Sequence, residues 1–133
     1  MTARKSTSGG KGGRRYKGLP PKEPQRITLE RAVDLTQRYR KSAPASEHGG
    51  FFWADGIKEL LEQPNVVGLR YYHGLDADGH YEIVLVGVDQ SGRDVVKISR
   101  PKGARAARAA GDAVLLDMHY MCPPWCDVTS PLL

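Results

Sequence analysis

The stretch VVGLRYYHGLDADGHYEIVLVGVDQSGRDVVKIS, residues 66–99, decides the fold of this 133-residue chain. β-Branched and aromatic residues dominate 66–72, 81–88 and 95–99, and Asp-, Ser- and Gly-rich turns separate these runs. Such an alternation is typical of strands joined by hairpins. Two successive turns predict an antiparallel meander. Its central strand is the nearly apolar run 81–88, with both faces partly covered.

Helices are expected before the strands. Thr28 is a good N-cap for a helix whose apolar face recurs every three or four residues until Pro44. A shorter helix follows the aromatic run 51–53 and stops at Pro64. Residues 114–118 return as a fourth strand. The prediction is an α+β domain: two N-terminal helices packed on one face of a three- to four-stranded antiparallel meander.

The chain divides into a basic arm, residues 1–26, and one domain, residues 27–133. The formal net charge is +5, yet the arm alone holds eight Lys or Arg residues against one Glu. Its Gly-, Ser- and Pro-rich composition predicts disorder, because little apolar surface is available to bury. A basic arm binds polyanions such as nucleic acid through phosphate contacts, without reading sequence. The candidate polyanion-binding residues are Arg4, Lys5, Lys11, Arg14, Arg15, Lys17, Arg105 and Arg108.

Apolar runs in this sequence are short. None approaches the ~18 residues of a membrane-spanning helix, and the basic start is not followed by the apolar region of a signal peptide. We therefore expect a cytoplasmic protein with no membrane partner, in a compartment where thiols stay reduced.

Both cysteines belong to one short motif, Cys122-Pro123-Pro124-Trp125-Cys126. Two prolines fix the backbone between the thiols and hold them close enough to bridge. The first interpretation is therefore a structural latch, bridged or not, in which Trp125 is an apolar plug against the sheet.

Metal binding and thiol redox chemistry are the alternative interpretations of this motif. His119, Cys122 and Cys126 would supply three of the four ligands of a zinc site. The fourth would come from His48, His73, His80 or Asp117. A redox couple fits less well, because the spacing is one residue longer than Cys-x-x-Cys and no helix follows.

Other groups of residues are better explained by structural roles than by catalysis or metal binding. Cys122 with His119 and Asp117 is the only tight nucleophile grouping, and no catalytic elbow or phosphate loop is present, so we expect no catalytic residues and no cofactor. Asp76, Asp78 and Asp89 adjoin turn glycines, which favours tight turns over a calcium loop.

The aromatic run Phe51-Phe52-Trp53 is the densest in the chain. Aromatic clusters beside a helix start usually pack inward, so we expect these side chains in the core. An exposed version of the cluster would instead be a site for a partner.

A longer pattern runs through the domain. It comprises VGLRYY at 67–72, GLD at 74–76, VLVGVD at 84–89, LD at 116–117, CPPWC at 122–126 and SPL at 130–132. On these residues, positions 27–133 resemble a group of small bacterial proteins of unassigned function, familiar especially from Bacteroidetes. The resemblance implies a soluble α+β domain with a C-terminal Cys-Pro-Pro-x-Cys signature and implies no activity. The Ala-rich basic stretch 100–110 and the arm lie outside the pattern.

These features together predict a small, non-enzymatic interaction module. Its partner is a protein, with polyanion contacts through the arm. The alternative is a zinc-binding or thiol-redox protein centred on His119, Cys122 and Cys126.

Overall fold

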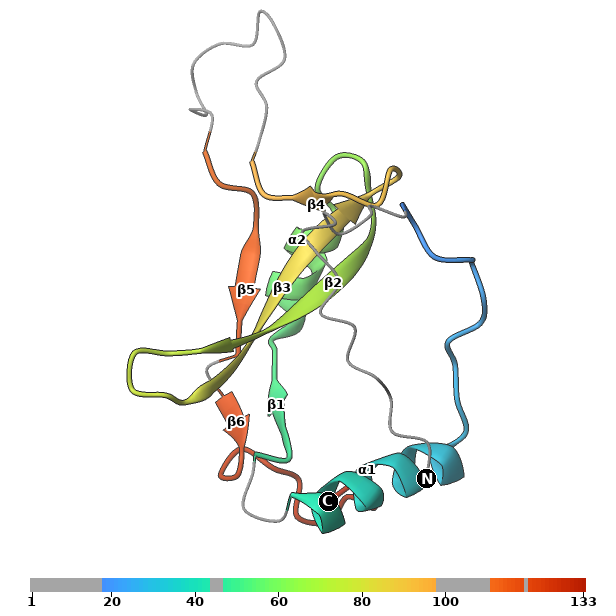
Figure 1. The fold of residues 1–133 in the computed structure, drawn as a ribbon, viewed down its shortest axis with the longest axis vertical. Helices are drawn as coiled ribbons and strands as arrows, with labels where there is room; N and C mark the ends of the chain where they lie inside the picture. Colours follow the sequence, from blue (N-terminus) through green and yellow to red (C-terminus); the bar gives the residue numbers. More distant parts are fainter. Residues whose placement is uncertain (1–17, 44–46, 98–110, 119) are drawn as a thin grey trace, which may run out of the picture.

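The computed structural model describes residues 18–43, 47–97, 111–118 and 120–133. Within them the chain forms two helices and six antiparallel strands, which confirms the α+β class (Figure 1). In chain order the elements are α1 Leu29–Ser42, β1 Gly49–Phe51, α2 Ala54–Leu61, β2 Val66–Leu75, β3 Tyr81–Asp89, β4 Asp94–Val95, β5 Leu115–Asp117 and β6 Tyr120–Cys122.

β3 is the central strand of a four-stranded sheet (Figure 1). β2 pairs with one side of β3, from Leu75 opposite Tyr81 to Val66 opposite Asp89. β4 and β5 share the other side of β3. The antiparallel meander with residues 81–88 at its centre is therefore confirmed.

The later strands are shorter than the sequence predicted. The third strand, expected over 95–99, is the two-residue β4, and Lys97 continues it only as an isolated bridge to Asp112. Residues 98 and 99 lie outside the described part of the chain. The fourth strand, expected over 114–118, is the three-residue β5.

Both hairpin turns of the large sheet are held by an aspartate. Asp76 and Asp89 each accept two main-chain N–H groups through one carboxylate oxygen, at 2.8 to 3.0 Å. Gly79 and Gly92 adopt φ values of +83° and +81°, a conformation that favours glycine. The turn interpretation of these residues is therefore confirmed.

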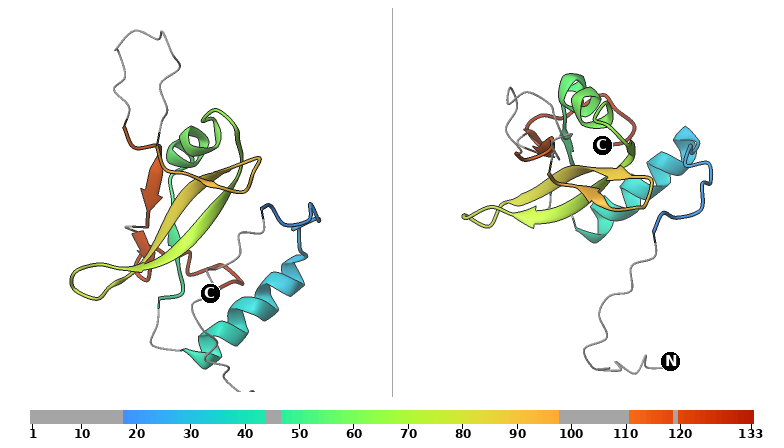
Figure 2. Two further views of the ribbon diagram at one scale, coloured as in Figure 1. Left: turned by 45° about the horizontal axis from the view of Figure 1, so that its top comes forward. Right: turned by 90° about the horizontal axis from the view of Figure 1, so that it is seen from above.

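α2 packs on one face of the large sheet and contacts β2, β3 and β5 (Figure 2). Its Leu60 is fully buried, whereas the neighbouring Leu61 is 43% exposed. Gln63 ties the end of α2 to the sheet: its amide donates to the Leu60 carbonyl at 2.9 Å and accepts from the Val114 N–H at 2.8 Å. The chain reverses at Asn65, which has a positive φ of 66°.

α1 begins at the expected N-cap, because the Thr28 hydroxyl oxygen accepts the Arg31 N–H at 3.1 Å. None of its residues is buried. It lies at the end of the molecule away from β4, where Arg40 donates a hydrogen bond to the Leu132 carbonyl (Figure 1). Neither described helix is long and apolar enough to cross a membrane. The cytoplasmic location stays a prediction.

The structure also contains a second, two-stranded sheet of β1 and β6, which the sequence did not predict. It adjoins the large sheet at Met118, whose N–H donates to the Ile83 carbonyl of β3 at 3.0 Å. The Met118 side chain is 2% exposed and lies against Gly50 of β1. A Cβ on residue 50 would overlap the Met118 sulfur, so β1 needs glycine at this position.

Adjacent leucines of α2 provide a matched test of this packing. Leu60→Ala should lower the free energy of unfolding by about 2–5 kcal/mol, because it leaves a cavity in the core. Leu61→Ala should cost less than half as much, since that side chain is 43% exposed and its removal leaves no enclosed cavity. Urea denaturation of both variants measures the difference. Equal losses would contradict the orientation of α2.

Candidate functional site

Four aromatic rings form a row across the small sheet. Phe51 of β1 lies directly opposite Tyr120 of β6, so their side chains share one face. Trp53 packs edge-to-face on Phe51 with ring centroids 5.1 Å apart. Trp125 packs edge-to-face on Tyr120 at 5.5 Å. The order Trp53, Phe51, Tyr120, Trp125 is called the aromatic row below.

The aromatic row is exposed. Its members are 67%, 44%, 41% and 63% accessible in that order. The expectation that Phe51 and Trp53 belong to the core is therefore wrong, and so is the expectation that Trp125 plugs the sheet. The cause is the alternation of side chains in β1: Gly50 faces the buried Met118, so Phe51 faces outward.

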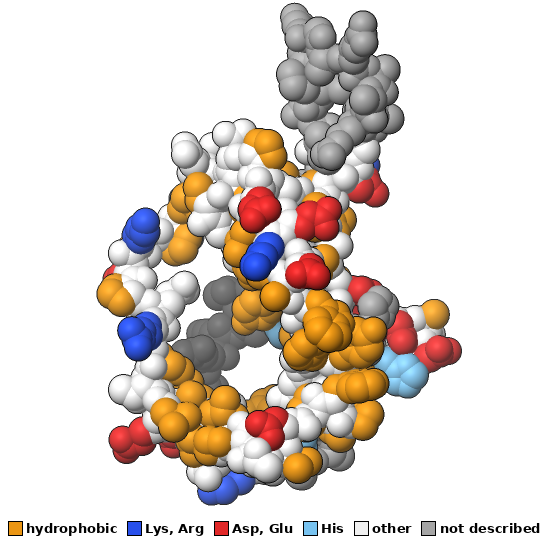
Figure 3. All heavy atoms as spheres, turned by 180° about the vertical axis from the view of Figure 1, so that it is seen from behind, with side chains coloured by type: hydrophobic (Ala, Val, Ile, Leu, Met, Phe, Trp, Pro, Cys, Tyr) orange, Lys and Arg blue, Asp and Glu red, His pale blue; other side chains and the backbone are white. Residues whose placement is uncertain are grey.

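The row lines a groove of about 460 Å³, together with Pro124 and Cys126. A smaller hollow of about 250 Å³ continues from it over Leu115, Leu116 and Gly56. Seen from behind, hydrophobic side chains gather at the level of β1 and β6, with carboxylates and a basic side chain beside them (Figure 3). We call this surface the aromatic groove.

Carboxylates outnumber basic residues in the segments that build the aromatic groove. Residues 47–61, which include all of α2, and residues 114–133 contain five carboxylates and one Lys. The carboxylates are Glu47, Asp55, Glu59, Asp117 and Asp127, and the basic residue is Lys58. The Thr129 hydroxyl, at 2.6 Å, and the Thr129 N–H, at 3.0 Å, hold the pKa of Asp127 below its usual range, so this carboxylate keeps its charge.

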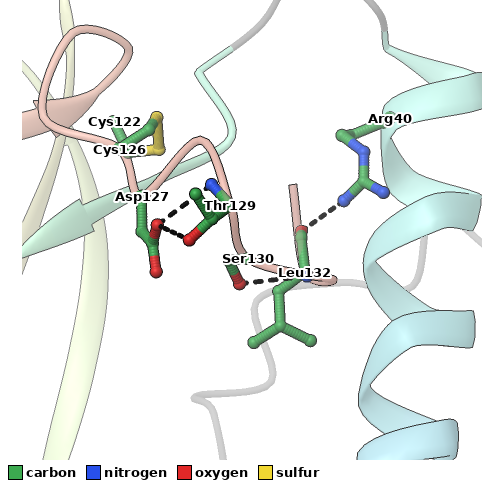
Figure 4. The surroundings of a disulfide bond; sticks show 7 residues. All are labelled: Arg40, Cys122, Cys126, Asp127, Thr129, Ser130 and Leu132. Atoms are coloured by element: carbon green, nitrogen blue, oxygen red, sulfur yellow. Dashed lines mark hydrogen bonds between the residues drawn. A yellow bond between two sulfur atoms is a disulfide. The ribbon is translucent and has the colours of Figure 1, made fainter.

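Cys122 and Cys126 form a disulfide at one end of the groove (Figure 4). Their Cα atoms are 4.6 Å apart, and the Trp125 N–H donates to the Met121 carbonyl at 3.0 Å within the same turn. The bond therefore closes the loop that turns Trp125 back onto Tyr120. This bond fits both the latch and the oxidised form of a thiol-redox couple, so both interpretations stay predictions.

The C-terminal segment runs from the disulfide to α1 (Figure 4). Asp127 and Thr129 close its first turn, and the Ser130 hydroxyl accepts the Leu132 N–H at 3.1 Å. The Leu132 carbonyl then accepts the hydrogen bond from Arg40. The segment that follows the disulfide thus connects the small sheet to α1.

The zinc interpretation is only partly covered by the described residues. His119 lies outside them, and the two sulfurs are bonded to each other, so thiolate ligands exist only in the reduced protein. Among the candidate fourth ligands, His48 lies beside the motif, because its N–H donates to the Cys122 carbonyl at 3.0 Å. The Nδ1 atom of His48 is buried and has no hydrogen-bond partner among the described residues. Zinc binding stays a prediction.

The other two histidine candidates lie on the β2–β3 hairpin. His73 bonds the Tyr81 hydroxyl and His80 lies 3.1 Å from Asp76. Asp76, Asp78 and His80 bring ligand atoms within 4.8 Å of one another on the surface. The His80 N–H lowers the pKa of Asp76, so the cluster is explained by the turn it holds.

The remaining sequence-based candidates and the comparisons add no further site. All eight candidate polyanion-binding residues, from Arg4 to Arg108, lie outside the described part of the chain. No protein-family model, no curated protein and no solved structure matches this chain. The resemblance to small bacterial proteins therefore stays a prediction.

Replacing both cysteines should destabilise the protein. The disulfide closes a loop of five residues, for which chain entropy predicts a loss of about 2 kcal/mol on opening. Cys122→Ser with Cys126→Ser should lower the free energy of unfolding by this amount, measured by urea denaturation. A dithiol reductant should reproduce the loss in the wild type and leave the double variant unchanged. An unchanged wild type would contradict the latch.

Proposed function

We propose that this protein is a non-enzymatic interaction module that binds a protein partner through the aromatic groove. The observation that carries the proposal is the exposure of all four rings of the aromatic row in one groove. Tryptophan and tyrosine dominate the binding energy of protein interfaces, because they bury large areas at little entropic cost.

The mechanism of such binding follows from the packing of the row. Edge-to-face contacts hold Trp53 against Phe51 and Trp125 against Tyr120, so each tryptophan is oriented before a partner arrives. The disulfide adds a covalent restraint at the Trp125 end. Preorganised rings lose little conformational entropy on binding. Less of the favourable free energy of burying them is therefore cancelled, and the affinity is higher.

Site-specific crosslinking tests the groove directly. A photo-crosslinking phenylalanine analogue at position 53 or 125 should capture a discrete partner polypeptide in extracts of the native cells. The same analogue at position 71 is the matched control, because Tyr71 is 59% exposed on β2. Adducts should form at 53 and 125 and not at 71.

Competition makes the crosslinking result specific. Excess wild-type protein should suppress the adducts, whereas Trp53→Ala with Trp125→Ala should not. Adducts of equal yield at all three positions, or competition by the double variant, would contradict binding through the aromatic groove.

We also propose polyanion contacts through the arm. Residues 1–17 carry six positive charges and no acid, while the whole chain has a net charge of +5. The rest of the chain is therefore slightly acidic, and phosphate attraction is concentrated in the arm.

Deleting residues 1–17 tests this second contact. Retention on immobilised DNA should be lost, and the slope of log affinity against log salt should fall by up to about 5. The control is unchanged circular dichroism of the shortened chain. Retention that survives the deletion would place binding in the domain.

A further inference from the structure

The chain contains a segment whose chemistry matches the aromatic groove. Residues 14–26, RRYKGLPPKEPQR, hold three prolines and five positive charges against one Glu. Leu19 and the residues that follow it to Arg26 are all exposed. We propose that residues 14–26 of a second copy of this protein bind in the aromatic groove. This inference rests on the proposed function, because it names the partner of the same groove.

Proline is the first part of the match. Pro20, Pro21 and Pro24 fix φ at three positions, and the Glu23 N–H donates to the Pro21 carbonyl at 3.0 Å, so less backbone entropy remains to be lost on docking. Such segments are recognised by grooves lined with aromatic rings, which pack against the proline rings. The aromatic groove offers Trp53, Phe51, Tyr120 and Trp125 in a continuous row.

Charge is the second part of the match. The segment carries a net +4, while the segments that build the groove contain five carboxylates and one Lys. Opposite charges at the rim of an interface steer association and fix the direction of the docked chain. An acidic groove and a basic proline-rich segment therefore favour each other over neutral partners.

The described part of the segment lies apart from its own groove. Gly18 lies against Gly92 in the β3–β4 turn, and Thr28 caps α1. The chain between them runs along the side of the molecule opposite β1 and β6, in all three ribbon views (Figures 1 and 2). Since this part of the chain and the strands that carry the groove lie on opposite sides, docking joins two copies.

Tryptophan fluorescence reports on the groove without a label. The two tryptophans of the chain are both in the aromatic row, and the peptide of residues 14–26 contains none. Titrating the full chain with this synthetic peptide should shift the tryptophan emission saturably. A peptide with Pro20, Pro21 and Pro24 replaced by alanine should bind at least about tenfold more weakly, and so should the wild-type peptide on Trp53→Ala. Tyr71→Ala is the matched control and should bind normally.

Full-length variants then test docking between copies. Sedimentation should show concentration-dependent association of the wild type, and none for Trp53→Ala or for Pro20→Ala, Pro21→Ala, Pro24→Ala. Mixing these two variants should restore a complex, because one supplies an intact groove and the other an intact segment. All substituted side chains are exposed, so each variant should keep its circular dichroism.

The outcomes separate the two proposals. No saturable peptide binding, or equal binding of the alanine peptide, overturns the match between segment and groove. If the peptide binds but the full-length protein does not self-associate, the proposal that a second copy occupies the groove is overturned. In either case, groove-specific crosslinks at positions 53 and 125 to another protein would leave the proposed function standing. Loss of those crosslinks as well would overturn both.

Discussion

The burial of Met118 between the two sheets is the constraint on which the rest of the structure depends. Its main chain continues β5 by bonding to Ile83 of the large sheet, while its side chain fills the space above Gly50 of β1. One residue thereby sets the position of both strands of the small sheet. Because side chains alternate along a strand, burying this contact turns Phe51 and Tyr120 to the outside.

The aromatic row combines residues from two distant parts of the chain. β1 supplies Phe51, the start of α2 supplies Trp53, and β6 with the disulfide loop supplies Tyr120 and Trp125. The Cys122–Cys126 disulfide closes the loop in which Trp125 packs back onto Tyr120. It also begins the segment that ends on α1, so the groove and that helix are mechanically connected.

Local signals made much of this fold predictable. The Thr28 cap, the aspartate–glycine turns and the apolar run 81–88 act over a few residues, and each forms as expected. The residues of the small sheet, 49–51 and 120–122, have no comparable local pattern. Gly49 and Gly50 have little strand propensity, and their partners lie some seventy residues later in the chain. The alternation of Phe51 and Trp53 was the available hint that both rings share a face.

What the sequence determined by itself was the α+β class, the meander and the presence of aromatic and cysteine side chains able to interact. Short-range caps, turns and hydrophobic patterns carry that information. Only the tertiary structure decided that the aromatic side chains are exposed, since burial depends on which residue faces Met118. The same contact decided that two tryptophans distant in sequence share one groove. Exposure is a property of the assembled sheets, and no local pattern encodes it.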